Sequence, residues 1–308
     1  DLSRLLHALK QPDLGDLLDT VTGQVRFDGN DQNLKLDPLK VQLGLSGKKM
    51  SGAPDFVALE MPVQWQMAQQ RLELPSFSIS GLDLAVSGSL AAENIQTSPE
   101  YSGHLSVARF NLRQLAKKLA IPLPETTDVK VFEKVGFETR FDGSATDIRL
   151  IGLSGVLDDT QMNGSLAVTD FANPDITVEL AVDQINVDRY LPPGGSDAQG
   201  KKQTSKPVTP ETVAAGAGTQ IPVALLRNLQ VTAALAVDGL VVSGASLSQV
   251  RAKLTAKDGI IDAAPLSANL YNGVYDGKVT LNAAGDVPQL SVNSSLKGIE
   301  VEPLLEDM

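Results

Sequence analysis

Side chains that could carry out chemistry are few and widely separated in this sequence. Only two histidines occur, His7 and His104, and neither has the His-x3-His or His-Glu-x-x-His spacing that brings metal ligands together. Gly-Leu-Ser-Gly occurs at 44–47 and again at 152–155, but a nucleophilic serine needs the spacing Gly-x-Ser-x-Gly. We therefore interpret both glycine stretches as turns and both histidines as surface residues.

Two further candidates for chemistry have simpler interpretations. Gly-Lys-Lys at 47–49 lacks the upstream glycine of a phosphate-binding loop. Asp158 and Asp159 could form an acid pair, but no partner group is identifiable, so we expect a solvated turn. The sequence thus predicts a non-enzymatic protein without a metal site or a cofactor.

The composition narrows the classes of partner. Of 308 residues, 42% are hydrophobic but only 4% are aromatic, so the apolar material is mainly Leu, Val, Ile and Ala. The formal charge of −11 argues against binding to nucleic acid and against polybasic docking on anionic head groups. Cysteine is absent, which excludes disulfides and thiolate chemistry. If lipid is a partner, burial of its tails must supply the binding free energy.

The elements that carry the apolar residues are predicted to be β-strands. After Pro174, the residues Ile176, Val178, Leu180 and Val182 alternate with polar or small ones. This period of two, apolar on one face and polar on the other, is typical of a half-exposed antiparallel strand. The same alternation occurs in most of the sequence, and Asp-Gly and Asn-Gly steps such as Asn272-Gly273 and Asp276-Gly277 predict hairpin turns between strands.

Self-comparison reveals a repeat, which governs the architecture. Three stretches share an apolar pair, a glycine and a proline at matching spacings, beginning at Leu72, Ile148 and Ile261. Each copy closes with a helix-like signal, clearest where Leu112, Leu115, Ala116 and Leu119 follow Asn111. Weaker versions are Val187, Tyr190 and Leu191 in the second copy and Val301, Leu304 and Leu305 in the third, and the chain opens with the same element at Leu2, Leu5, Leu6 and Leu9. We expect the segment to be cut from a longer protein.

The repeats predict a mainly β protein with a few short helices. Its long twisted antiparallel sheet is built from the repeats and is expected to curl into a half-open groove. Residues 1–121 form the first repeat region with its two helices, 129–191 the second repeat and 221–308 the third. Residues 192–220, rich in Pro, Gly, Ser and Ala, are expected to be a flexible insert.

Two readings of the apolar strand faces remain open. They could form the core of an ordinary sandwich or sheet–helix layer, which periodicity alone favours. They could instead line an open groove, because the chain offers few helices to cover them and a smooth aliphatic lining suits acyl chains.

The repeats resemble the AsmA family of bacterial envelope proteins. Three motifs carry the resemblance, and two shorter ones resemble an earlier repeat of the family. The motifs are Ile-Asn-Val-Asp-Arg-Tyr-Leu-Pro-Pro at 185–193, Ile-Pro-Val-Ala-Leu-Leu-Arg-Asn-Leu at 221–229, Leu-Ser-Ala-Asn-Leu-Tyr-Asn-Gly-Val-Tyr-Asp-Gly at 266–277, Ser-Gly-Leu-Asp-Leu at 80–84 and Gly-His-Leu-Ser-Val-Ala-Arg-Phe-Asn-Leu at 103–112.

The resemblance implies a periplasmic β-groove anchored in the inner membrane by an N-terminal helix that this chain lacks. It also implies bridge-like lipid transfer, with a role in phospholipid movement to the outer membrane and in outer-membrane assembly. Phospholipid acyl chains are the expected partner and envelope proteins are further candidates, whereas no catalytic residue is implied. No apolar stretch of about 20 residues is present in the chain itself.

The expected groove lining is the apolar face of the three strands that follow the repeat prolines. It comprises Leu105, Val107, Ile176, Val178, Leu180, Val182, Leu290, Val292 and Leu296. The alternative function is a scaffold that holds outer-membrane protein precursors by pairing with exposed strand edges.

Overall fold

A computed structural model describes residues 18–30, 32–45, 55–193, 230–285 and 288–300. Three predicted segments lie outside the described residues. They are the opening helix with Leu2, Leu5, Leu6 and Leu9, most of the 192–220 insert, and the closing helix of the third repeat.

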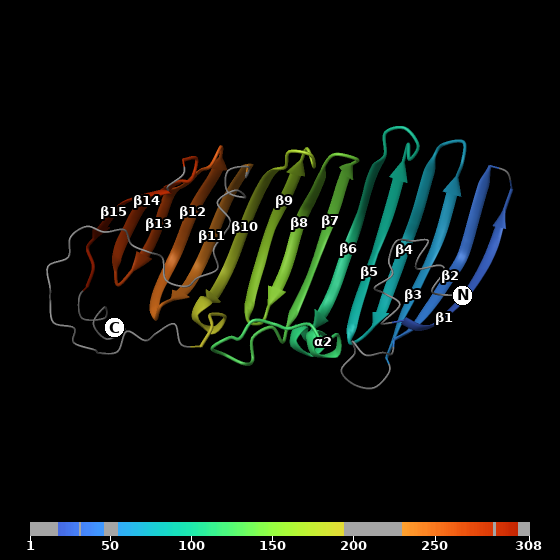
Figure 1. The fold of residues 1–308 in the computed structure, drawn as a ribbon, viewed down its shortest axis with the longest axis horizontal. Helices are drawn as coiled ribbons and strands as arrows, with labels where there is room; N and C mark the ends of the chain where they lie inside the picture. Colours follow the sequence, from blue (N-terminus) through green and yellow to red (C-terminus); the bar gives the residue numbers. More distant parts are fainter. Residues whose placement is uncertain (1–17, 31, 46–54, 194–229, 286–287, 301–308) are drawn as a thin grey trace.

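Fifteen strands make up nearly all of the described regular structure. Their bounds are β1 Leu18–Gly29, β2 Asn33–Leu45, β3 Asp55–Gln66, β4 Arg71–Gly81, β5 Leu84–Glu93, β6 Glu100–Phe110, β7 Val135–Ser144, β8 Ile148–Leu157, β9 Thr160–Thr169, β10 Asp175–Asn186, β11 Gln230–Val242, β12 Ala245–Lys257, β13 Ile260–Leu270, β14 Gly273–Asn282 and β15 Gln289–Lys297. They form one sheet whose spatial order is the order of the sequence (Figure 1). The predicted long sheet is therefore confirmed.

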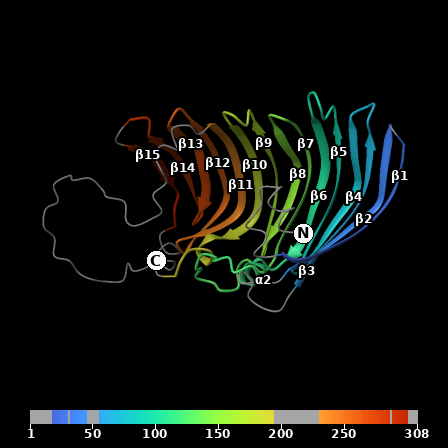
Figure 2. The ribbon, with the colours of Figure 1, turned by 45° about the vertical axis from the view of Figure 1, so that its right-hand side comes forward.

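The sheet is open and curled. In the described part of the chain, β1 and β15 each pair on one side only, so the sheet does not close. Its strands are visibly bent (Figure 2), so the sheet has one concave and one convex face. At about 4.8 Å between neighbouring strands, the fifteen strands span roughly 65 Å.

All strand pairs are antiparallel except one. β10 and β11 run parallel, with Ile176 opposite Val231 and Val182 opposite Val237. Antiparallel neighbours can be joined by a tight turn, whereas parallel neighbours need a long connection that returns the chain to the starting end. The expectation of antiparallel strands thus holds everywhere but at this step.

The turns are not where the Asp-Gly steps predicted them. Asp142-Gly143 lies inside β7 and Asp276-Gly277 inside β14. The glycine stretch at 152–155 is also not a turn, because it lies within β8, where Gly152 has φ of 63° at a register shift. Tight turns are formed by pairs such as Leu82-Asp83 and Tyr271-Asn272, whose residues have positive φ. The turn predicted at Asn272-Gly273 is therefore present, shifted by one residue.

Aromatic rings occupy the space above several strand glycines. A Cβ on Gly103 would meet the ring of Phe141 on β7, and a Cβ on Gly143 would meet the ring of Tyr101 on β6. These cross-strand pairs, Gly103 with Phe141 and Gly143 with Tyr101, are directly opposite in the ladder. The ring covers the glycine backbone and supplies the packing that the glycine lacks. This explains why Gly143 belongs in a strand rather than in a turn.

The helical elements are short. α2 spans Leu112–Lys118, where the sequence predicted a helix, and the side chain of its N-cap residue Asn111 accepts a hydrogen bond from the amide of Gln114. The second copy has only a 3₁₀ turn, η2, at Val187–Arg189. Both elements lie at the lower ends of the strands in Figure 1.

Two rims bound the sheet. We define the lower rim as the side of the sheet where strand ends meet α2, residues 119–134, η2 and the β8–β9 turn. The upper rim is the opposite edge, which includes the β5–β6, β7–β8 and β9–β10 turns (Figure 1).

Candidate functional site

One row of side chains crosses the sheet without a polar interruption. Each member is directly opposite the next one in the strand ladder, so all of them lie on the same face. The row consists, from β1 to β15, of Gly29, Leu34, Trp65, Leu72, Ala92, Tyr101, Gly143, Ile148, Val168, Ile176, Val231, Ala256, Ile261, Leu281 and Leu290. We call this the long apolar row.

A second apolar row lies nearer the lower rim on the same face. It runs unbroken from β1 to β12 through Gly23, Val41, Leu59, Ile79, Val86, Val107, Phe137, Gly155, Met162, Val182, Val237 and Val250. The shared face is therefore apolar along the sheet and not only within single strands.

The opposite face has the reverse character. One of its rows crosses all fifteen strands through Gln24, Lys40, Glu60, Ser78, Ser87, Ser106, Glu138, Ser154, Asn163, Ala181, Ala236, Arg251, Ser267, Asp276 and Ser295. Only the two alanines in this row are apolar. The sheet therefore has one apolar and one polar face over its whole described length, as expected for a sheet with one face exposed to water.

The predicted lining residues all lie on the apolar face. Ile176 and Leu290 belong to the long apolar row, whereas Val107 and Val182 belong to the second row. Val178 is opposite Leu166 and Ala233, and Val292 is opposite Val279. Leu105, Leu180 and Leu296 have the same phase on their strands as these residues. The ladder therefore brings the nine positions onto one surface.

The predicted set missed most of the surface. Trp65, Leu72 and Ile148 in the long apolar row lie on strands outside the post-proline segments. The signal was available, because Leu72, Ile148 and Ile261 are the first positions of the three sequence repeats and the structure places all three in this row. Equivalent positions of the repeat therefore occupy equivalent positions across the sheet.

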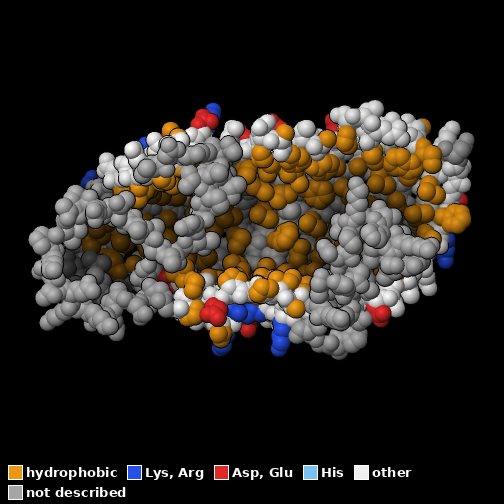
Figure 3. All heavy atoms as spheres, in the orientation of Figure 1, with side chains coloured by type: hydrophobic (Ala, Val, Ile, Leu, Met, Phe, Trp, Pro, Cys, Tyr) orange, Lys and Arg blue, Asp and Glu red, His pale blue; other side chains and the backbone are white. Residues whose placement is uncertain are grey.

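This face has no second layer over it among the described residues. Hydrophobic side chains gather along its hollowed middle (Figure 3). Leu290, Val292 and Leu296 on β15 are 68%, 59% and 54% exposed. The largest described side chain with almost no exposure is only a valine, Val131. An ordinary sheet of this size would bury its apolar face against another layer.

A depression of about 600 Å³ lies over β9 to β13. Most of the residues that line it have the phase of the opposite face, and Asn163, Ala181, Ala236 and Arg251 belong to the row described above for that face. The depression therefore lies over the small alanine side chains of the opposite face and is not part of the apolar surface.

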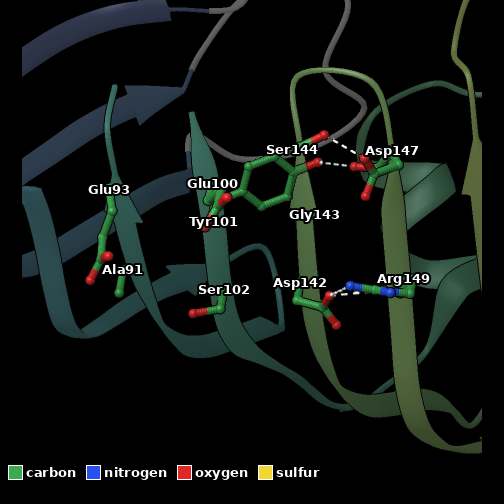
Figure 4. A pocket seen from close by; sticks show the side chains of 10 residues that line it. All are labelled: Ala91, Glu93, Glu100, Tyr101, Ser102, Asp142, Gly143, Ser144, Asp147 and Arg149. Carbon is green, nitrogen blue, oxygen red and sulfur yellow. Dashed lines mark hydrogen bonds and ion pairs between the residues drawn. The ribbon is translucent and has the colours of Figure 1, made fainter. Parts of the chain in front are cut away.

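A second depression, of about 520 Å³, is polar and lies at the upper rim between β5 and β8 (Figure 4). Several of its polar side chains are paired with near neighbours. Arg149 Nε donates to Asp142 Oδ2 across 2.8 Å, Ser144 hydrogen-bonds Asp147, and the Tyr101 hydroxyl donates to the Asp147 carbonyl across 3.0 Å. No nucleophile and base converge here, because these contacts join immediate neighbours.

The lower rim holds a buried carboxylate. Asp158 is 7% exposed, and its oxygens accept hydrogen bonds from the amides of Phe132, Glu133 and Lys134 and from the hydroxyl of Tyr190. Burial alone would raise the pKa of Asp158, but these hydrogen bonds outweigh it and lower the pKa below its ordinary value of 3.8. The expected solvated acidic turn is therefore wrong for Asp158, although Asp159 beside it is exposed.

Ion pairs complete the rim network. Arg189 Nε lies 2.9 Å from Asp128 Oδ2 and Arg189 Nη1 lies 3.2 Å from Asp159 Oδ2. Burial, followed by the neighbouring Asp158, raises the pKa of Tyr190, so its phenol remains a hydrogen-bond donor. These contacts are structural, since each charge is satisfied by a neighbour.

Within the described ranges, no group of three or more His, Cys, Asp or Glu residues could hold a metal ion. The described helices are also too short and too polar for any of them to span a membrane. His104 is exposed on the polar face, as expected, and His7 lies outside the described residues.

The described chain is an open, repeat-built β-sheet with one continuous aliphatic face. This architecture is typical of proteins that bind ligands along a groove. The family model of the AsmA family matches residues 109–308, and the chain belongs to that family. A search of curated proteins gave no match, and a search of solved structures gave none either.

Proposed function

We propose that this segment is a non-enzymatic lipid-handling module that holds phospholipid acyl chains on its apolar face. The long apolar row carries the proposal, because it gives an acyl chain a lining without polar interruption across fifteen strands. Membership of an envelope-associated family supports it. In this proposal the protein is periplasmic, is anchored in the inner membrane outside this segment, and contributes to phospholipid transport to the outer membrane and to outer-membrane assembly.

The proposed binding rests on burial of the acyl chain against the apolar face, without one fixed position for the chain. Each acyl CH2 removed from water contributes roughly 0.8 kcal/mol. Neighbouring members of the row, such as Val168, Ile176 and Val231, offer similar aliphatic surface. A tail shifted by one strand loses and gains similar contacts, so it is held along the groove with little preference for one position. Transfer along such a surface needs no catalytic group.

Site-specific photo-crosslinking tests the proposal. A photoreactive residue at Leu180 or Val292, on the apolar face, is expected to give lipid adducts when cells are irradiated. The same residue at Glu179 or Ser291, one position away on the polar face, is the matched control and is expected to give none. Mass spectrometry of the adducts identifies the lipid. Adducts from neither face in a well-folded protein would contradict the proposal.

A second candidate function is supported by one observation. β15 is exposed at every residue and pairs only with β14 among the described strands. Such an edge can accept an additional strand, so the segment could hold unfolded outer-membrane proteins by strand pairing. Saturable binding of an unfolded barrel protein by the lipid-free segment would favour this function over lipid handling.

A further inference from the structure

The apolar face has a definite width between the two rims. On β10 it runs from Ile176 in the long apolar row to Val182 in the second row, and Val178 and Leu180 lie between them in the same phase. Ile176 and Val182 are six residues apart, which at about 3.3 Å per residue is roughly 20 Å along the strand. We call the part of the face between these two rows the apolar strip.

Both sides of the apolar strip end at a change in the strands. Below the second row, the next residues of the same phase on β10, β11 and β12 are Gln184, Gly239 and Ser248, which supply no aliphatic side chain. The ladder between β6 and β7 is irregular at the same level, directly after Val107. Above the long apolar row the strip ends with the strands themselves, because Ile176 is the second residue of β10.

The two rims bound the strip differently. From β6 to β10 the lower rim is a packed segment, in which Val131 is fully buried, Ala116 is 4% exposed, and the amide of Thr127 donates to the Leu191 carbonyl across 2.7 Å. On the same strands the upper rim consists of turns (Figure 1), and Asp170 is exposed in one of them. A polar head group loses free energy when it is taken out of water, whereas the methyl end of an acyl chain gains it. The solvated upper rim therefore suits the head group and the lower rim suits the methyl end.

We propose that each acyl chain lies along the strands within the apolar strip, with its methyl end toward the lower rim and its head group at the upper rim. The inference rests on the proposed lipid function and defines the lipids that fit, which are those with chains of the length found in bilayers. One leaflet contributes about 15 Å to a hydrocarbon core of about 30 Å, so such a chain fits a strip of roughly 20 Å. A chain lying across the strands would instead have roughly 65 Å of apolar row and no limit on its length.

The rows then provide the path for movement. Val178 is opposite Ala233, and Leu180 is opposite Leu235, so the next strand offers the same sequence of aliphatic contacts from rim to rim. A chain that shifts sideways by one strand, about 4.8 Å, keeps its methyl end and its head group at the same rims. Its head group therefore stays in water during each step.

Position-resolved photolabelling of the 308-residue chain tests the orientation. Two phosphatidylcholines are compared, one with a diazirine at the methyl end of a chain and one with the diazirine beside the ester group. The methyl-end probe is expected to label Val107 and Val182 severalfold more than the long apolar row. The ester-side probe is expected to show the opposite preference, for Tyr101 and Ile176. Mass spectrometry of peptides locates the adducts, and Glu179 on the polar face is the control that should remain unlabelled.

The outcomes separate this inference from the function on which it rests. Equal labelling of both rows by both probes would overturn the orientation and keep the lipid function. A methyl-end probe that prefers the long apolar row would overturn the assignment of the head group to the upper rim. Label on neither row, in a folded protein, would contradict the lipid function itself.

Chain length gives an independent measurement. Lysophosphatidylcholines of increasing chain length, added as monomers, displace a fluorescent lipid from the purified chain. The affinity is expected to rise by up to about fourfold for each added CH2 and to level off once the acyl chain is longer than the apolar strip. A rise that continues well beyond the chain length found in bilayers would show that chains lie across the strands, and it would overturn the proposal.

Discussion

The phenol of Tyr190 donates a 2.9 Å hydrogen bond to Oδ2 of Asp158, and this contact joins the segment after β10 to the β8–β9 turn. The ring of Tyr190 also packs edge-on against Phe132, with centroids 5.4 Å apart. Because Asp158 also binds the backbone that leads into β7, one carboxylate connects three parts of the lower rim.

Removal of this carboxylate is expected to be costly. Asp158→Ala removes the acceptor of the amides of residues 132–134 and of the Tyr190 hydroxyl, so the stability should fall by about 3 kcal/mol. The urea midpoint measures the loss. Asp159→Ala, at the exposed neighbour, should change stability by less than about 1 kcal/mol. Similar losses from both substitutions would mean that the hydrogen bonds of Asp158 are not the cause.

The same residue predicts a dependence on pH. The pKa of Asp158 is lower in the folded protein than its ordinary value of 3.8, so the unfolded chain binds the proton more readily. The stabilisation is complete above pH 3.8 and is lost as the pH falls through the lower folded pKa. Urea midpoints of the wild type and Asp158→Asn should therefore converge in acid. A constant difference across this range would exclude the linkage.

The two strand faces should respond oppositely to charge. Val178→Asp places a carboxylate in the apolar surface beside Leu166 and Ala233, and we expect loss of bound lipid or of the fold. Thr177→Asp, one residue away on the polar face, should change stability by less than about 0.5 kcal/mol. Lipid extracted from the purified proteins and their melting curves give the comparison. Equal behaviour would contradict the strand register.

Glycines under aromatic rings should tolerate no side chain. Gly103→Ala brings a Cβ against the ring of Phe141 and the carbonyl of Ser89, and it should cost about 2 kcal/mol. Gly23→Ala is the control, because its Cβ would meet only the Lys40 carbonyl at an ordinary 3.7 Å. Thermal melts of both variants measure the difference. A mild effect at Gly103 would show that the strands separate easily at this point.

The ion pair at the lower rim should limit local opening. Arg189→Ala removes the partner of Asp128, so the amides of Thr127 and Asp128 should exchange hydrogen faster. Hydrogen exchange read by mass spectrometry on peptides from 121–134 measures this. Peptides from β4 serve as the internal reference, and faster exchange there as well would indicate global rather than local destabilisation.

Much of the fold was predictable because it depends on short-range periodicity. Alternation located the strands, and the repeat alignment located equivalent strands, so that Leu72, Ile148 and Ile261 occupy one row. The cap at Asn111 was predictable for the same reason, since the helix signal and its capping residue are local.

What sequence reasoning missed depends on neighbours across the sheet. Gly143 was taken for a turn residue because a glycine after an aspartate favours a turn. Its strand conformation follows from Tyr101 on the adjacent strand. Asp158 was taken for a solvated residue because its ligands come from residues 132–134 and from Tyr190, which no local pattern connects to it. The parallel β10–β11 pair likewise reflects the path of a long connection.

That parallel pair determines how units can be added to the sheet. The second repeat begins at β8, four strands after the first at β4, and strict alternation preserves its direction. The third begins at β13, five strands later, and would run upside down if every pair were antiparallel. One parallel step restores the direction, so all three copies start at the same rim and finish at the other. Duplication of the gene segment that encodes one repeat can thus lengthen the sheet without inverting the added copy. The length of the sheet then depends on the number of repeats.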